Sequence, residues 1–344
     1  MTDIRSATAA LVDGTDLDRD TMQAVMRQIM TGEATPAQIA GFLVALRIKG
    51  ETVDEIAGAA AVMRELASPV PVDAAYRDTL VDVVGTGGDA SGVFNVSTAS
   101  AFVVAAAGGR VAKHGNRAVS GKSGAADVLE AAGVRLALSP EAAARCVAEL
   151  GVAFLFAPAF HGAMKHAIGP RRELGLRTVF NLLGPLTNPA GAPNQLLGVY
   201  DRRWLEPMAA VLRELGSRHV LVVCSEDGLD EISHAAPTHF AELRDGEVLT
   251  GVLNPAELGV EPGSLDDVKA IDATVSLACL REALGTGRGA RADLVALNAG
   301  AALYVAGLAD TISAGVEQAR GVMRDASALA RLEAYAARSR ELAA

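Results

Sequence analysis

The chain has 344 residues, of which 50% are hydrophobic, and it carries a formal net charge of −10 at pH 7. This length and composition predict a soluble globular protein with a large core and more than one domain. The acidic balance argues against broad nucleic-acid binding, which requires a basic face. The three cysteines lie far apart among aliphatic residues, which is typical of buried thiols in a reducing cytoplasm, and neither an export signal nor a membrane span is expected.

The first seventy residues are predicted to be helical. Hydrophobic periodicity, together with capping residues, predicts three helices, at 19–31, 36–48 and 53–67. The proline-rich stretch 68–71 cannot continue a helix and predicts a linker. A further helix at 161–176 is expected to fold back against the first three. We therefore expect a helical N-terminal domain over 1–72, joined by inserted helices at about 161–190, and an α/β domain over 73–344.

Beyond residue 72, short apolar runs alternate with helical patterns. The apolar runs predict buried parallel strands at 80–84, 110–113, 152–156, 195–199 and 219–223. Helices are predicted at 97–107, 124–132, 140–150, 204–216 and 291–308, with closing helices within 311–341. The segment 238–249, with Asp245-Gly246 at its centre, predicts an antiparallel hairpin near the sheet edge. The expected fold class is α/β, with a small helical domain and a larger α/β domain whose central sheet is mostly parallel with an antiparallel edge.

The first of two glycine-rich polar loops follows the predicted strand at 80–84. It reads Gly85-Thr86-Gly87-Gly88-Asp89. Glycine permits positive φ and close backbone approach, so successive N–H groups can converge on phosphate oxygens. A dinucleotide-binding loop is excluded because no Asp or Glu lies between Asp89 and Asp127 to hold a ribose. Taken alone, the loop could equally be a tight turn followed by an ordinary helix cap.

The second loop runs from Lys113 to Gly124 and concentrates cations, amides and hydroxyls without a carboxylate. Its end resembles a Walker loop, but Asn116 stands where the leading glycine should be. The composition therefore predicts an anion-binding loop. In an open parallel sheet, ligands bind beyond the carboxyl ends of the strands, so we expect the two loops to face one cleft.

Several motifs occur in a specific order along almost the whole chain. They are Gly85-Thr86-Gly87-Gly88-Asp89, Asn95-Val96-Ser97-Thr98, Lys113-His114-Gly115-Asn116-Arg117, Arg171-Arg172-Glu173-Leu174 with the following 180–189 segment, and Asp230-Glu231. In this order and spacing the sequence closely resembles the anthranilate phosphoribosyltransferases of tryptophan biosynthesis. The resemblance implies transfer of the 5-phosphoribosyl group from phosphoribosyl pyrophosphate (PRPP) to the amine of anthranilate. One alternative is a pyrimidine nucleoside phosphorylase of the same fold, which the Asn116-Arg117 segment and the Asp230-Glu231 pair argue against. The other is a nucleic-acid-binding module, which the net charge of −10 argues against.

The resemblance also implies which residues bind the substrates. Anthranilate is expected to contact Gly85, Asn116 and Arg171, and Mg²⁺, expected as two ions, to contact Ser97, Asp230 and Glu231. PRPP is expected to contact Gly85, Gly88, Asp89, Val93, Asn95, Val96, Ser97, Thr98, Lys113, His114, Gly115, Asn116, Arg117, Ala118, Val119, Ser120, Gly121 and Ala125. No catalytic residue is assigned with certainty, because His114 could accept a proton from the amine or could serve packing alone.

The chain departs from the family at three positions that usually carry hydroxyl groups. These positions are Val93, Gly121 and Ala125, and each lost hydroxyl removes a possible hydrogen bond of roughly 0.5–1.5 kcal/mol. The backbone donors of the loops remain, so phosphate binding is expected to weaken without being abolished.

A homodimer is the expected assembly, and no nucleic-acid or membrane partner is expected. The resemblance implies a dimer, and the apolar side chains of the helix at 36–48 favour one because a thin helical layer is not expected to bury them all. These side chains are Phe42, Leu43, Leu46 and Ile48.

Overall fold

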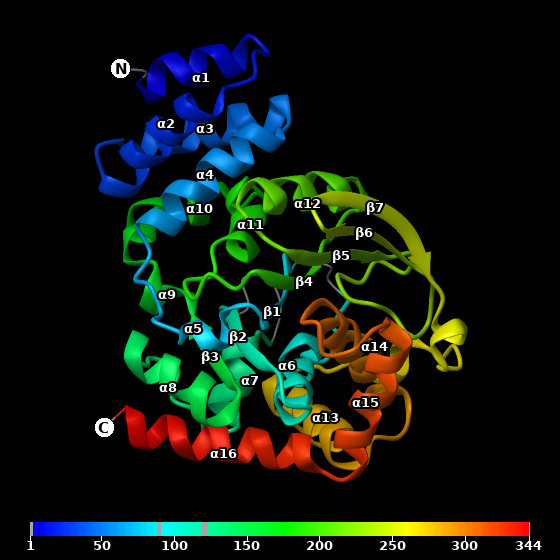
Figure 1. Cartoon of the computed structure of the whole chain (residues 1–344). Coiled ribbons are helices and arrows are strands. Elements are labelled where there is room, and N and C mark those ends of the chain that lie inside the picture. The colour runs from blue at the N-terminus through cyan, green and yellow to red at the C-terminus, as the bar shows by residue number, and fades with distance from the viewer. Residues whose placement is uncertain (1–2, 88–90, 118–122, 344) are drawn as a thin grey trace.

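The computed structural model describes residues 3–87, 91–117 and 123–343. Four N-terminal helices form a bundle beside a larger α/β unit (Figure 1). The bundle consists of α1 (Ile4–Val12), α2 (Arg19–Thr31), α3 (Pro36–Lys49) and α4 (Val53–Glu65). Capping boxes at Thr35 and Thr52 start α3 and α4, as the sequence predicts. Helix α1, which begins after the cap residue Asp3, is not among the predicted helices.

One seven-stranded sheet forms the centre of the α/β unit. Its strands are β1 (Leu80–Gly85), β2 (Arg110–Gly115), β3 (Val152–Phe156), β4 (Asn194–Gly198), β5 (His219–Ser225), β6 (Thr238–Arg244) and β7 (Glu247–Leu253). They lie in the order β3-β2-β1-β4-β5-β6-β7; the first five are parallel, whereas the β5–β6 and β6–β7 pairs are antiparallel. The predicted fold class is therefore confirmed.

The strand order reverses at β1. The chain places β2 and β3 on one side of β1, and later places β4 and β5 on the other side. Such a reversal leaves a crevice beyond the carboxyl ends of the two central strands, where ligands bind in open parallel sheets. Here the crevice lies beyond β1 and β4, whose register pairs Gly85 with Gly198.

Helices surround the sheet (Figure 1). They are α5 (Ala74–Arg77), α6 (Val96–Ala106), α7 (Ala125–Ala131), α8 (Pro140–Leu150), α9 (Ala157–Phe160), α10 (Lys165–Leu174), α11 (Phe180–Leu183), α12 (Leu205–Glu214), α13 (Ala273–Thr286), α14 (Ala290–Val305), α15 (Ile312–Arg324) and α16 (Ser327–Leu342). The predicted helix at 161–176 is divided into a 3₁₀ turn and α10, which ends where Gly175 adopts a left-handed backbone. Helix α10 packs against α2 and α3, while the predicted domain boundaries stay a prediction.

Two hydrophobic cores use opposite faces of the sheet. Leu196 of β4 joins the core formed with α6, α7, α8 and the C-terminal helices, and its neighbour Leu197 joins the core formed with the N-terminal bundle and α12. The bundle core fully buries Phe42, Leu43 and Leu46. The expectation that the helical layer cannot bury all four side chains is therefore confirmed for Ile48 alone, which is exposed.

None of the helices formed by the described residues has the length and apolar character that a membrane crossing requires.

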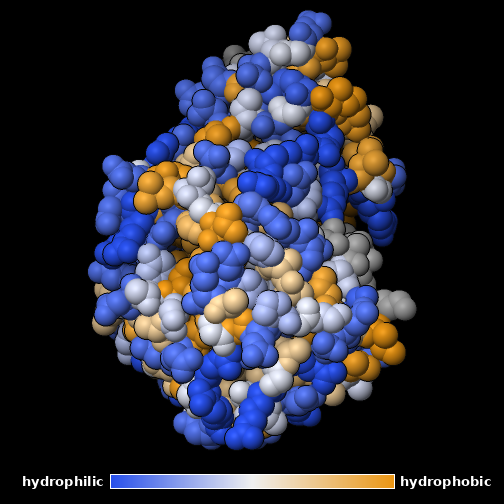
Figure 2. Space-filling model, turned by 90° about the vertical axis from the view of Figure 1, so that its right-hand side faces the viewer, coloured by the Kyte–Doolittle hydropathy of each residue, from blue (hydrophilic) through white to orange (hydrophobic). Residues whose placement is uncertain are grey.

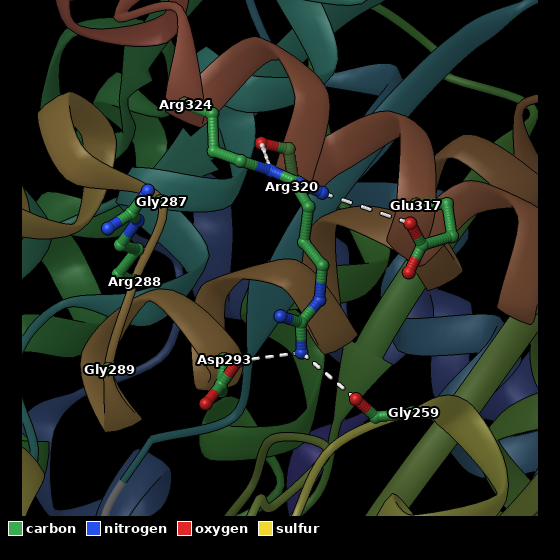
Figure 3. Close-up of a pocket in the computed structure, with 8 residues that line it drawn as sticks. All are labelled: Gly259, Gly287, Arg288, Gly289, Asp293, Glu317, Arg320 and Arg324. Carbon is green, nitrogen blue, oxygen red and sulfur yellow. Dashed lines mark hydrogen bonds and ion pairs between the residues drawn. The ribbon is translucent and has the colours of Figure 1, made fainter.

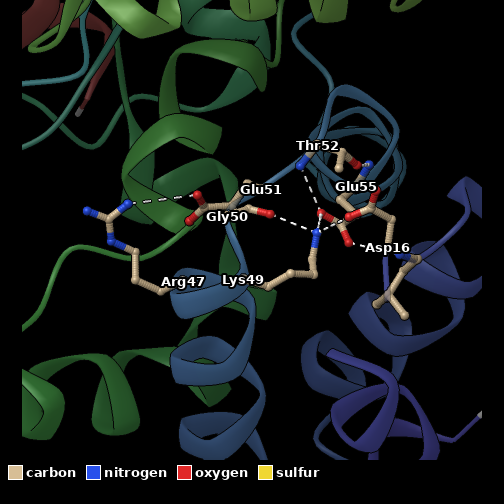
Figure 4. Close-up of polar contacts among 8 residues, drawn as sticks. Asp16, Arg47, Lys49, Gly50, Glu51, Thr52 and Glu55 are labelled. Atoms are coloured by element: carbon tan, nitrogen blue, oxygen red, sulfur yellow. Dashed lines mark hydrogen bonds and ion pairs between the residues drawn. The ribbon is translucent and has the colours of Figure 1, made fainter. Parts of the chain in front are cut away.

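A buried ion pair ties the start of α4 to the end of α3 (Figure 4). Lys49 Nζ donates to Glu55 Oε2 at 3.0 Å and to Asp16 Oδ1 at 2.5 Å. The Glu55 carboxylate, which is 0% exposed, also accepts the backbone N–H groups of Leu17 and Thr52. One carboxylate therefore satisfies the buried lysine, caps α4 and fixes the α1–α2 connection.

The Glu55→Ala substitution is expected to destabilise the protein strongly. It removes the buried partner of the Lys49 ammonium, which keeps only the exposed Asp16 and the Gly50 carbonyl, and it leaves two backbone donors without their acceptor. Breaking a buried ion pair in this way costs about 3–5 kcal/mol. Glu65→Ala is the matched control on the same helix, because Glu65 pairs with Arg27 at the surface, where a pair contributes at most about 1 kcal/mol. Urea unfolding followed by circular dichroism measures both losses; equal losses would contradict the structural role of Glu55.

Candidate active site

The two glycine-rich loops lie beyond the carboxyl ends of β1 and β2. The structure describes 85–87 of the first loop and 113–117 with 123–124 of the second. The predicted PRPP contacts that lie outside the described residues are Gly88, Asp89, Ala118, Val119, Ser120 and Gly121. The remaining predicted residues can be located one by one.

Lys113, at the end of β2, points inward beneath both loops. It is 4% exposed, and its Nζ donates to the Val83 carbonyl of β1 at 2.5 Å and to Ser97 Oγ in the first turn of α6 at 3.0 Å. Burial lowers the pKa of Lys113, whereas the carboxylates of Asp82, Glu231 and Asp230 oppose that shift. The lysine therefore brings the end of β1, the start of α6 and the predicted metal-binding carboxylates into one electrostatic cluster.

Asp230 contacts the first glycine loop directly. The Gly87 backbone N–H donates to Asp230 Oδ2 at 2.8 Å. On the other side of Asp230 in sequence, the buried Asn298 of α14 accepts from the Ile232 N–H and donates to the Ile232 carbonyl, both at 2.9 Å. Sequence reasoning missed Asn298, whose signal is a lone amide within the apolar part of α14 that follows Asp293. The Asp230 loop is therefore held by two contacts. Asn298 of α14 binds Ile232, and the Gly87 N–H of the first glycine loop binds Asp230.

The oxygen donors near Asp230 suit Mg²⁺. Magnesium prefers hard oxygen ligands, retains several waters and needs only one or two carboxylates plus substrate phosphates. Asp230, Glu231 and the Ser97 hydroxyl are such donors. Among the residues that the structure describes, there is no group of three or more His, Cys, Asp or Glu side chains able to hold a metal by itself. This donor set suits a metal that binds together with a phosphorylated substrate.

Asp82 is a second buried carboxylate, on β1. It accepts from the His114 N–H at 3.1 Å and from Asn188 Nδ2 at 2.7 Å, and Asn188 Nδ2 also donates to the Ala112 carbonyl. Burial raises the pKa of Asp82 to about 6, against the lowering effect of Lys113. Asp82 and Asn188 therefore lock the end of β2, and with it the start of the second loop, to β1.

His114 is buried beside a second histidine. Its Nδ1 lies 3.0 Å from the Gly184 carbonyl and donates to it, and its ring centroid lies 5.0 Å from that of His161. Burial and the neighbouring His161 lower the pKa of His114 to about 3. The Nε2 atoms of both rings are buried without a hydrogen-bond partner. A histidine in this environment stays neutral, and it is a weak base.

The two arginines predicted to bind substrate differ in their surroundings. Arg171, near the end of α10, lies over the Phe180 ring with 4.9 Å between guanidinium carbon and ring centroid, and burial lowers its pKa. No carboxylate among the described residues forms an ion pair with Arg171. Arg117 instead pairs with Asp127 at 3.0 Å and with Glu130 at 2.6 Å on α7. Arg171 is thus available to an anionic ligand, whereas Arg117 is held at the surface.

The other predicted residues form the walls around the two loops. Asn95 Oδ1, at the start of α6, accepts from Ser123 Oγ of the second loop at 3.1 Å and from Ser276 Oγ at 2.9 Å. Val96 and Thr98, at the start of α6, are buried. Asn116 Oδ1 accepts from the Arg117 N–H. Val93 forms a β-bridge with Lys269. Gly115 is the last residue of β2, and Ala125 is the first residue of α7.

Figure 3 shows a separate pocket of about 450 Å³. It is formed by the loop around Arg288 and by α15, and none of the predicted site residues lines it. Arg320 Nη2 reaches Asp293 at 2.7 Å and the Gly259 carbonyl at 3.2 Å, so this arginine is neutralised within the protein. The candidate active site remains at the strand ends, where ligands bind in open parallel sheets.

Comparison with known families covers nearly the whole chain. Residues 5–67 match the family model described as "Glycosyl transferase family, helical bundle domain", and residues 77–329 match "Glycosyl transferase family, a/b domain". Anthranilate phosphoribosyltransferase of Thioalkalivibrio sulfidiphilus is 61% identical over 331 residues, which are 96% of this chain and 97% of that protein. The enzyme of the same name from Methylococcus capsulatus is 58% identical and covers 97% of each chain.

Solved structures agree with these sequence matches. The crystal structure of anthranilate phosphoribosyltransferase from Thermus thermophilus superposes with a TM-score of 0.91 at 45% identity and covers 97% of this chain and 99% of that one. Anthranilate phosphoribosyltransferase from Saccharomyces cerevisiae in complex with PRPP and Mg superposes with a TM-score of 0.88 at 25% identity, with 98% of each chain covered.

The buried Asp82 is expected to make stability depend on pH. Its folded-state pKa of about 6 lies above the ordinary 3.8, so folding favours the protonated form, and this contribution is lost as pH rises through 6. Between about pH 4 and pH 7, the unfolding temperature of Asp82→Asn should fall less than that of the unaltered protein. Asp245→Asn, at an exposed turn, should show the same fall as the unaltered protein. Calorimetry across this range measures the slope, and an unchanged slope in Asp82→Asn would contradict the assignment.

Proposed function

Because the chain belongs to the anthranilate phosphoribosyltransferase family, we propose that it transfers the 5-phosphoribosyl group of PRPP to the amine of anthranilate in tryptophan biosynthesis. The products are N-(5-phosphoribosyl)anthranilate and pyrophosphate. The observation that carries the proposal is the convergence of Lys113, Ser97 and Asp230 with the first glycine loop at the reversal of strand order. Cations, hydroxyls and converging backbone donors at this place suit a polyphosphate.

The proposed PRPP site uses both loops. Backbone donors of the first loop, the start of α6 and the second loop hold the pyrophosphate and ribose. Asp230, Glu231 and Ser97 hold Mg²⁺, which we propose as two ions, and the metal neutralises charge that develops on the departing pyrophosphate. The Saccharomyces cerevisiae relative was solved with PRPP and Mg, which supports this arrangement. Because Val93 and Ala125 lack hydroxyls, these two positions can contribute backbone groups only.

The proposed anthranilate site depends on Arg171. Its planar guanidinium can receive the substrate carboxylate through two hydrogen bonds, with Gly85 and Asn116 in the same pocket. The aromatic amine of anthranilate is already neutral at pH 7, so orientation against the ribose carbon is the main requirement. His114 orients neighbouring groups through its Gly184 contact, since its low pKa makes it a poor base for the amine proton.

We further propose a homodimer that forms through the N-terminal bundle, with the helical domain ending near residue 72. Figure 2 shows apolar side chains on the surface at the top of the molecule, where this bundle lies. Ile48 at the end of α3 is 82% exposed and Val12 at the end of α1 is 73% exposed. Light scattering during size-exclusion chromatography tests the assembly, because a mass of one chain would contradict it.

Purified protein is expected to consume anthranilate fluorescence when PRPP and Mg²⁺ are both present. Arg171→Ala should raise the KM for anthranilate roughly 10-fold to 100-fold, because a hydrogen bond to a charged group contributes about 1.5–3 kcal/mol. Arg172→Ala, the exposed neighbour on α10, is the matched control and should leave that KM unchanged. Absence of turnover by the unaltered protein would contradict the proposed function, and phosphate-dependent cleavage of uridine or thymidine would favour a nucleoside phosphorylase.

A further inference from the structure

We infer that Gly198, at the carboxyl end of β4, is a positioning residue that fixes the location of Asp230. The inference rests on the proposed function, because that function assigns Asp230 to the metal site. Gly198 and its β1 neighbour Gly85 form a floor without side chains beneath Asp230. The space that the two glycines leave open is what allows the carboxylate to lie against the first glycine loop.

A side chain at position 85 or 198 would clash with Asp230. Gly85 and Gly198 are paired across β1 and β4. A side chain at either position would therefore point to the same face of the sheet. A Cβ added to Gly198 would lie 1.5 Å from the Asp230 carbonyl oxygen, and a Cβ added to Gly85 would lie 2.4 Å from Asp230 Oδ2. Neither distance is compatible with a real contact. The backbone of residue 230 therefore rests on Gly198, while its carboxylate lies over Gly85.

The loop that carries Asp230 is held on both sides. Before it, the Ser225 N–H donates to the Leu229 carbonyl at 3.0 Å. After it, Asn298 binds the N–H and the carbonyl of Ile232. Because these contacts prevent the whole loop from retreating, a methyl group at position 198 would displace Asp230 locally.

The same strand end also fixes the first glycine loop. The Thr86 N–H donates to the Gly198 carbonyl at 2.9 Å, and the Tyr200 N–H donates to Thr86 Oγ1 at 3.2 Å. Residues 198–200 thus set the separation between the phosphate-binding backbone and the metal-binding carboxylate. A shift of about 1 Å between such groups is enough to lower a rate roughly 100-fold. Gly198 does not have a positive φ, so the position needs open space rather than an unusual backbone.

Manganese binding tests the inference without depending on turnover. Free Mn²⁺, used in place of Mg²⁺, is measured by electron paramagnetic resonance in the presence of PRPP for the unaltered protein and for Gly198→Ala. The affinity of Gly198→Ala for Mn²⁺ should fall at least roughly 10-fold because Asp230 is displaced. Gly321→Ala on α15 is the matched control, since a Cβ there meets nothing within 4 Å, and it should bind Mn²⁺ as the unaltered protein does.

Each outcome discriminates. Equal Mn²⁺ affinity of Gly198→Ala and the unaltered protein would overturn the inference but not the proposed function. A lower unfolding temperature of Gly198→Ala without loss of Mn²⁺ affinity would have the same meaning. No Mn²⁺ binding by the unaltered protein with PRPP would overturn the proposed metal role as well. If Gly198→Ala does not fold, Gly85→Ala decides, because its added Cβ meets only the end of the Asp230 side chain. An unchanged affinity in that variant would overturn the inference.

Discussion

The ammonium group of Lys113 is removed from water, and the candidate active site is arranged around the compensation of its charge. A buried cation is tolerated only where nearby oxygens replace its hydration. Here the replacement comes from the Val83 carbonyl, the Ser97 hydroxyl and the electrostatic influence of three carboxylates. Asp230 and Glu231 in turn favour the charged form of this lysine. The same lysine thus links the strand ends to the two carboxylates that we propose as metal ligands.

The sheet topology determines which residues take part in this cluster. Reversal of the strand order at β1 makes β1 and β4 neighbours, although more than one hundred residues separate them in sequence. The two cores on opposite faces of the sheet hold these strands rigidly, so the loops beyond them start from fixed points. Asp82 and Asn188 then tie β2 to β1 at the end where the second loop begins. Packing far from the crevice therefore sets its geometry.

Local signals in the sequence predicted much of the fold. Helix α2 and strand β3 begin and end where predicted, because caps, prolines and short apolar runs act within a few residues. Contacts between distant segments left no such signal. Phe42 is buried in α3, which packs against α1 and α10, and a periodicity within α3 cannot reveal those partners. The motifs likewise indicated Lys113 and Asp230, but not Asn298 or Gly198. The role of Asn298 exists only once it meets Ile232, 66 positions away, and that of Gly198 only once it meets Asp230.

The cations of the second loop show that amino-acid composition alone does not predict the role of each side chain. In sequence, Lys113 and Arg117 both look like phosphate ligands four positions apart. In the structure, Lys113 turns inward to β1 and α6, whereas Arg117 pairs with Asp127 and Glu130 on α7. Arg117 therefore ties the second loop to α7, and among the described groups Lys113 and the backbone N–H groups remain those that we propose to hold an anion. Because backbone donors do not depend on side-chain identity, this division of roles explains why the loss of hydroxyls at Val93 and Ala125 is compatible with an anion-binding crevice.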